Sequence, residues 1–272
     1  MSQPLSSSPP WWPSLRDRAH RQPASPRADL RVDGRVAGSV AWPLVELLVE
    51  AGLPLVVDHR AGHVAPRGDA SDALGEVAAW LHRHGHAGRW RDEPIAVRAM
   101  ADVEGPVLAV VERAAVRNLG IHTRAVQLHA REPHGGGWWL QQRALDKATD
   151  PGKWDTITGG LVAAGESVEV ALERESWEEA GVRLRELAAA PVAAGRFTVR
   201  RPVDDAGSHG YLVETVFAFV CALAPGQLPR NQDGEVLRFE CVSDAGIDRM
   251  VATGELTLEA AVAVALCRGV RA

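Results

Sequence analysis

The chain has 272 residues, of which 46% are hydrophobic and 24% charged, values that are ordinary for a globular protein. This length allows one large domain or two smaller ones. The formal net charge of −5 gives no support for sequence-independent binding of nucleic acid, which needs a strongly basic surface.

The cysteines and the hydropathy pattern predict the cellular setting. Cys221, Cys241 and Cys267 are odd in number and widely spaced, which fits neither a disulfide framework nor a zinc site and favours a reducing compartment. The sequence has no run of about 18 apolar residues that would span a membrane, and its N-terminus lacks the apolar segment of a secretory signal. We therefore expect a cytoplasmic protein without a membrane partner.

The first 118 residues divide into a tail and a small domain. Residues 1–28 are rich in Ser, Pro and Arg with few acids, which predicts a disordered tail, although Trp11 and Trp12 suggest docking on the folded body. Residues 29–118 show a small α+β pattern without a catalytic constellation of its own. The expected strands are at 30–32, 55–57, 94–97 and 107–111, and the expected helices are at 42–51, 69–82 and 112–118.

Residues 119–272 are predicted to form a second domain, in which strands precede and follow one conspicuous helix. Its expected strands are at 123–130, 138–142, 154–158, 191–199, 211–221 and 236–242, with a polar loop at 200–210. The expected helices are at 167–182, 244–253 and 258–267.

The helix at 167–182 has an unusual distribution of charge. At 3.6 residues per turn, an apolar stripe continues directly into three carboxylates. The residues on that side are Val168, Ala171, Leu172, Glu175, Glu178, Glu179 and Val182. Sheltered carboxylates repel one another unless a positive charge lies among them. The expected counter-charge is Mg²⁺, which takes oxygen ligands and retains coordinated waters for substrate phosphates.

The spacing around this helix is longer and more specific than a short motif. Gly160 is followed after five residues by Glu166, after seven more by Arg174-Glu175, after two more by Glu178-Glu179, and after one more by Gly181. This pattern resembles the Nudix box, although Ser176 stands where that family usually has an aliphatic residue. The resemblance implies the α/β class, an α/β/α sandwich with a mixed sheet, preceded here by a small α+β accessory domain. It also implies hydrolysis of a diphosphate bond with Mg²⁺, for which Mn²⁺ can substitute.

The resemblance also implies roles for individual residues. The Gly159 carbonyl, Glu178 and Glu179 would bind metal, and Glu175 would bind metal or orient the attacking water. Arg174 would hold the glutamates in place. Glu166 would act from the loop before the helix as an outer-sphere partner, and is a candidate substrate contact. The late acid Glu235 is a further candidate ligand. Candidate substrate contacts near the site in sequence are Arg143, Lys147 and Trp154, with a surface role for the cations and a core role for the tryptophan as alternatives.

Several flanking segments resemble a particular branch of the family. The segments concerned are 141–143, Lys147, 151–155 and 230–236, with 89–93 resembling the end of an accessory domain. The branch is the Nudix part of fungal thiamine pyrophosphokinase fusions and their plant relatives. It implies thiamine diphosphate, or its oxidised analogues, as the small-molecule substrate. Alternatives are hydrolysis of nucleotide sugars or dinucleotides such as ADP-ribose, and a diphosphate-binding regulatory module without catalysis. The accessory domain would complete the pocket or mediate a homodimer.

Overall fold

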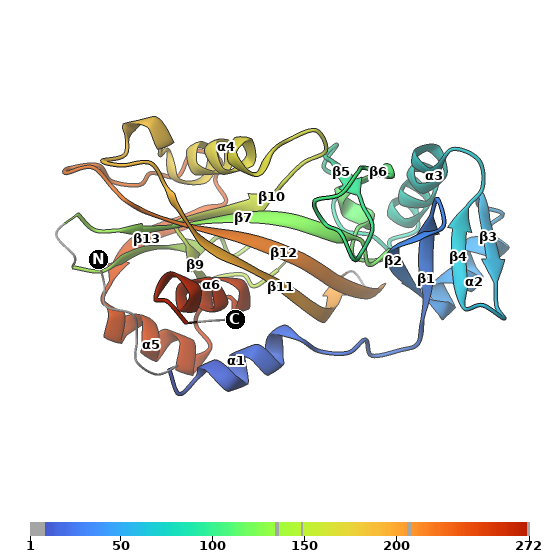
Figure 1. Cartoon of the computed structure of the whole chain (residues 1–272), viewed down its shortest axis with the longest axis horizontal. Helices are drawn as coiled ribbons and strands as arrows, with labels where there is room; N and C mark the ends of the chain where they lie inside the picture. Colours follow the sequence, from blue (N-terminus) through green and yellow to red (C-terminus); the bar gives the residue numbers. More distant parts are fainter. Residues whose placement is uncertain (1–8, 134–135, 148, 206–207, 271–272) are drawn as a thin grey trace.

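Two sheets lie end to end along the long axis of the molecule (Figure 1). The computed structural model describes residues 9–133, 136–147, 149–205 and 208–270. The smaller sheet is built from the N-terminal part of the chain, and the larger one from residues after 121. In the part of the chain that the structure describes, no helix combines the length and the apolar character that crossing a membrane would need.

The N-terminal unit, residues 27–115, is a four-stranded sheet with two helices and a short ladder. Its sheet has the order β2 (Arg35–Ala41), β1 (Arg27–Val32), β4 (His63–Pro66), β3 (Leu55–Asp58). The remaining elements are α2 (Trp42–Glu50), α3 (Ala70–Arg83), β5 (Pro94–Val97), β6 (Ala109–Glu112) and the 3-10 turn η1 (Arg113–Ala115). Helix α3 begins after Asp69, whose carboxylate accepts hydrogen bonds from the amides of Ser71 and Asp72. Both helices lie where their apolar periodicity predicts them.

The larger sheet is mixed. Its main path runs β11 (Val192–Asp205), β12 (Ser208–Ala222), β7 (His122–Arg131), β8 (Trp138–Arg143), β13 (Val236–Val242). Two short strands, β9 (Trp154–Thr156) and β10 (Thr158–Leu161), pair with β8 and β7. Strands β7 and β12 run parallel, whereas the other pairs are antiparallel.

Helices cover both faces of this sheet. Helix α4 (Val168–Ala180) packs on the face that carries Val126 and Leu128. Helices α5 (Asp244–Thr253) and α6 (Leu258–Cys267) cover the opposite face, which carries Val216 and Ala218. Figure 1 shows α4 above the sheet and the other two helices below it. The predicted α/β/α sandwich is confirmed.

The prediction of a disordered tail is wrong for part of residues 1–28. Helix α1 (Trp12–Ala19) lies against α6 and β11, and buries Trp12, Leu15 and Ala19 along one face. The Trp11 indole donates a hydrogen bond to Asp248 at 3.2 Å. Apolar side chains at helical spacing therefore order a segment whose average composition is typical of disorder. Residues 1–8 lie outside the described residues.

The predicted loop at 200–210 is largely replaced by a long hairpin, because β11 continues to Asp205 and β12 begins at Ser208. Contacts with the N-terminal part of the chain support this extension. The Tyr211 amide donates to the Arg117 carbonyl at 2.8 Å, and the Tyr211 hydroxyl donates to the Arg21 carbonyl at 2.9 Å. Arg27 lies 5.6 Å from the Tyr211 ring centre and donates to the Asn118 carbonyl. Burial lowers the pKa of Arg27 to about 10.

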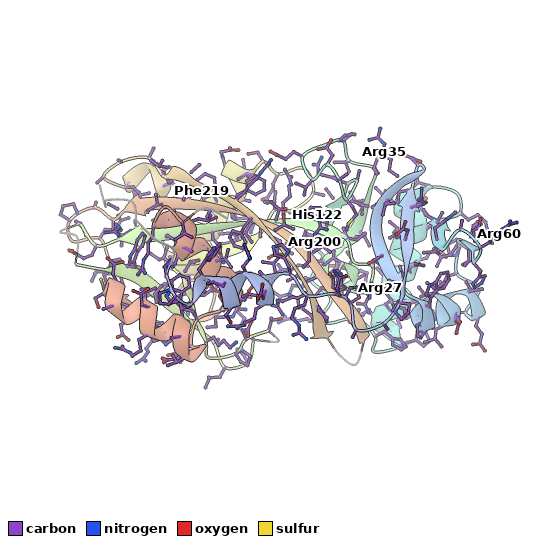
Figure 2. All side chains as sticks on the ribbon, turned by 60° about the horizontal axis from the view of Figure 1, so that its bottom comes forward. Arg27, Arg35, Arg60, His122, Arg200 and Phe219 are labelled. Atoms are coloured by element: carbon purple, nitrogen blue, oxygen red, sulfur yellow. The ribbon has the colours of Figure 1, made fainter. Side chains whose placement is uncertain are left out.

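Figure 2 shows the labelled Arg27 between the N-terminal sheet and this hairpin, with Arg200 and His122 further along the larger sheet. These contacts join the two sheets on one side of the molecule. The domain boundaries at 28 and 118 stay predictions.

Candidate active site

Helix α4 places carboxylates against the sheet. It begins after Ser167, whose hydroxyl accepts a hydrogen bond from the Val170 amide, and ends at Gly181, which has a φ of +62°. The glycine permits this left-handed end without the strain a side chain would bring. Within the helix, Glu175 and Glu179 are only 8% and 4% exposed, whereas Glu178 lies at the edge of the buried face.

Arg174 holds the acidic side chains in one network. Its guanidinium donates two hydrogen bonds of 2.9 Å to Glu166, one of 2.7 Å to Glu175 and one of 3.1 Å to Glu178. A further bond of 3.0 Å reaches the Leu161 carbonyl. These donated hydrogen bonds lower the pKa of Glu166. The geometry agrees with the expected holding role of Arg174, and it places Glu166 as the partner of Arg174.

Glu179 is fixed from the sheet side. Its Oε2 accepts hydrogen bonds of 2.9 Å from the Gly159 amide and from the Gln141 side chain. Burial, with the charge of Glu175 acting in the same direction, raises the pKa of Glu179 to about 7. Burial likewise raises the pKa of Glu175, against the opposing charge of Arg174. Burial therefore disfavours the ionised form of both carboxylates, and a positive charge placed beside them would oppose this shift.

Two glycines form a thin wall beside these carboxylates. A Cβ added to Gly160 would lie within 2.5 Å of both carboxylate oxygens of Glu175, and a Cβ added to Gly159 would lie 3.0 Å from Cγ of Gln127. The absence of a side chain at Gly160 thus lets the backbone of β10 approach Glu175. The absence of a side chain at Gly159 lets the same backbone approach Gln127 on the opposite face. The backbone of β10 separates the acids from that cavity by the thickness of one strand.

The cavity on the other side of β10 has a volume of about 240 Å³. Residues 123, 125 and 127 of β7 and residues 212, 214 and 216 of β12 line it, as the alternation of a strand requires. Segment 88–91 and η1 of the N-terminal unit close it from another side. Cations outnumber acids in its lining. The cations are Arg89, Arg91, Arg113, Arg117, Arg143, Lys147 and Arg201, and the acids are Asp150, Asp155, Glu214 and Glu259.

The predicted phosphate contacts lie at this cavity. Arg143 lines it and pairs with Asp155 at 3.1 Å, and Lys147 lines it and pairs with Glu235. Glu235 also lies 3.4 Å from Arg91 of the N-terminal unit. Glu235 is therefore held between two cations, and its role as a metal ligand stays a prediction.

Trp154 differs from its predicted role as a substrate contact. It is not among the residues that line the cavity and is buried in the core, where its carbonyl accepts a hydrogen bond from the Thr257 amide. Because neighbouring side chains of a strand point to opposite faces, Asp155 faces the cavity instead.

Sequence reasoning missed several cavity residues. Arg91 and Arg113 come from the N-terminal unit, and Gln127 and Glu214 come from the sheet. One signal was available: Thr123 and Gln127 are polar residues four positions apart on β7, so both side chains lie on the same face of that strand. A buried strand with polar residues at such positions indicates that one face lines a site.

The acids of α4 fit a hard divalent cation by their chemistry. Among the described residues, no three His, Cys, Asp or Glu side chains converge on a common point as in a formed metal site, and Glu175 and Glu178 are ion-paired with Arg174. The buried carboxylates of Glu175 and Glu179 nevertheless offer the oxygen ligands that a hard divalent cation takes. Glu175, Glu178, Glu179 and the Gly159 carbonyl are the groups that would hold it.

Comparison with known proteins places these features in a family. The sequence model of the NUDIX domain matches residues 121–262. Nudix hydrolase 24, chloroplastic, of Arabidopsis thaliana is 30% identical over 148 residues, which cover 54% of this chain and 39% of that protein. Nudix hydrolase 20, chloroplastic, of the same plant is 29% identical over 148 residues, covering 54% and 38%. The chain thus spans about two-fifths of the length of these curated relatives.

The fold has a counterpart among solved structures. DR0079 from Deinococcus radiodurans aligns with a TM-score of 0.50 and 20% identity, covering 63% of this chain and 98% of that one. At this identity the likeness shows the fold alone.

Proposed function

The chain belongs to the Nudix family, and from this premise we propose that it is a hydrolase that breaks a diphosphate bond with the help of a divalent cation. One observation carries the proposal. The buried pair Glu175 and Glu179 lies behind the Gly159–Gly160 wall of a cavity in which cations outnumber acids. A diphosphate needs both features, because its oxygens require positive charge and its reacting phosphorus requires a held water.

The residues of the chain divide this work. When bound by Glu175, Glu178 and Glu179, a divalent cation such as Mg²⁺ or Mn²⁺ supplies charge stabilisation and lowers the pKa of a water. Arg174 orients Glu175 and Glu178 through its hydrogen bonds. Glu175 engages Arg174 through Oε1, which leaves Oε2 to bind the cation or to orient the attacking water. Arg143 and Lys147, as cations of the cavity wall, bind phosphate oxygens.

Thiamine diphosphate, or an oxidised analogue, is the substrate that we propose, with the monophosphate and inorganic phosphate as products. The resemblance of residues 141–155 and 230–236 to the thiamine-linked branch supports this choice. ADP-ribose and dinucleotides form the alternative substrate class.

The N-terminal unit has a proposed role as an accessory domain that completes the cavity. Its segment 88–91 and its turn η1 line the cavity beside the strands of the larger sheet. Homodimer formation and a cytoplasmic location stay predictions from the sequence.

The direct test is phosphate release by the purified protein with Mg²⁺. We expect turnover of thiamine diphosphate or its oxo analogue, and loss of turnover in Glu179→Gln. If thiamine compounds are inert while ADP-ribose or a dinucleotide is hydrolysed, the hydrolase assignment stands and the thiamine assignment is wrong. If the wild type hydrolyses no diphosphate but binds one saturably, the non-catalytic binding module is the correct description.

A further inference from the structure

The cavity contains two hydrogen-bond acceptors that the hydrolysis does not use. They are the carboxylate of Glu214 on β12 and the amide oxygen of Gln127 on β7. Both side chains belong to the face of the sheet that lines the cavity, opposite to the face that carries α4. Their chemistry indicates what else the cavity binds besides phosphate.

Gln127 lies at the reaction end of the cavity. It is only 6% exposed, and its Cγ faces Gly159. The Gly159 amide donates a hydrogen bond to Glu179 of the proposed active site. Its Nε2 lies 3.5 Å from Asp155. Its Oε1 has no hydrogen-bond partner in the described part of the chain. A buried amide oxygen left in this state costs free energy, and a ligand N–H or O–H donor that reached it would remove that cost.

Glu214 lies at the other end. In the parallel pairing of β7 and β12 it stands opposite Thr123, whose hydroxyl lies 3.2 Å from its Oε2. Thr123 and Gln127 are four residues apart on β7, or about 13 Å along an extended strand. The cavity therefore runs along β7 from the reaction end at Gly159 to Glu214, a length that suits a diphosphate with an organic group attached.

Glu214 differs from Asp155 and Glu259, the neighbouring acids of the cavity, in its ion pairing. Asp155 is paired with Arg143 at 3.1 Å and Glu259 with Arg201 at 3.2 Å. Across the residues the structure describes, Glu214 has no such ion pair and is held by the hydroxyl of Thr123 alone. Burial, together with the charge of Glu259, raises the pKa of Glu214, although Arg117, the Thr123 hydroxyl and Arg113 oppose this. A ligand that brings N–H donors or positive charge would relieve this situation.

We propose that Glu214 and Gln127 are specificity-determining residues that select substrates whose organic group carries N–H donors, namely an amino-substituted or cationic nitrogen heterocycle. The inference rests on the proposed diphosphate hydrolysis and adds the recognition of the group that the diphosphate is attached to. A carboxylate accepts two adjacent N–H donors, such as a ring N–H and an exocyclic amino group. A substrate without donors leaves both acceptors buried and unpaired, and a site built for hydrogen bonds rejects such a substrate strongly.

The test compares two diphosphates that differ in these donors. Thiamine diphosphate carries an amino-substituted heterocycle, and benzyl diphosphate carries an aromatic ring without N–H groups. The wild type should prefer thiamine diphosphate in kcat/KM by about 100-fold or more. In Glu214→Gln this preference should fall by about tenfold or more, because one charged acceptor is lost. Gln127→Leu should lower it in the same direction. Glu240→Gln, the same change at a half-exposed position of β13, should leave the preference at its wild-type value.

The outcomes separate this inference from the proposed function. If the wild type hydrolyses both diphosphates equally well, or Glu214→Gln keeps the full preference, the inference is overturned while the hydrolase assignment stands. If the wild type hydrolyses neither, calorimetric titration with thiamine monophosphate and benzyl phosphate decides the inference without turnover. Tighter binding of the thiamine compound that Glu214→Gln weakens supports it, and equal binding of the two overturns it. Thermal unfolding of each variant verifies that the change acts in a folded protein.

Discussion

Replacing Gly160 with alanine is expected to displace the Glu175 carboxylate while the fold remains intact. The φ of Gly160 lies outside the left-handed region, so alanine meets no backbone strain. Its Cβ would lie within 2.5 Å of both carboxylate oxygens of Glu175, whereas ordinary contacts begin at 3.4 Å. The carboxylate must therefore move by about 1 Å or more, and a misplacement of that size costs about 100-fold in rate.

The cost in stability should be smaller, because a carboxylate is the far end of a flexible side chain. An off-rotamer Glu175 and a weakened bond to Arg174 together destabilise the protein by about 1–2 kcal/mol. The assay is kcat/KM for phosphate release with Mg²⁺, beside the free energy of unfolding in urea. Gly75→Ala is the matched control, because its Cβ enters open space in α3, where alanine should stabilise the helix by about 1 kcal/mol. Wild-type kcat/KM in Gly160→Ala would refute the reasoning, since Glu175 would then act without its observed position.

Four further changes test other parts of the structure. Arg174→Lys keeps the charge but loses the forked hydrogen bonds to the glutamates, so kcat/KM should fall by about 10–100-fold in steady-state assays. Arg91→Ala should raise KM by about threefold to tenfold, because a cation leaves the cavity wall; Arg60→Ala, at the far edge of the N-terminal unit in Figure 2, should not change it. Trp12→Ala should lower the free energy of unfolding measured in urea by about 3 kcal/mol, since Trp12 lies on the buried face of α1. Burial lowers the pKa of His129 to about 3, whereas the same side chain in the unfolded protein takes up a proton below about pH 6.5. Between pH 7 and pH 5 only the unfolded state gains this proton, so the free energy of unfolding should fall by about 2 kcal/mol. His129→Leu should lack this loss, and an unchanged pH dependence in that variant would contradict the assignment to His129.

Local patterns determined much of the fold. The helices at 42–50, 70–83, 168–180, 244–253 and 258–267 lie where apolar periodicity, caps and stops predict them. Strands β2 and β4 were missed: β2 contains Gly38, and β4 has only four residues and ends in Pro66. Both pair with β1. Helix α1 was missed for a related reason. Its composition is that of a disordered segment, and only its contact with α6 makes its apolar face useful.

The acidic helix could be read from the sequence because its information is local. The inward stripe that ends in Glu175 and Glu179, and the spacing from Gly160 to Gly181, follow from helical geometry. The cavity could not be read in this way. Thr123 and Glu214 are 91 residues apart, and Arg91 and Glu235 are 144 residues apart. Only the parallel pairing of β7 with β12 and the placement of the N-terminal unit bring these side chains to one space. Alternation along a strand predicts which residues share a face. Tertiary packing decides which face joins the core, as that of Trp154 does, and which face lines a site, as that of Asp155 does.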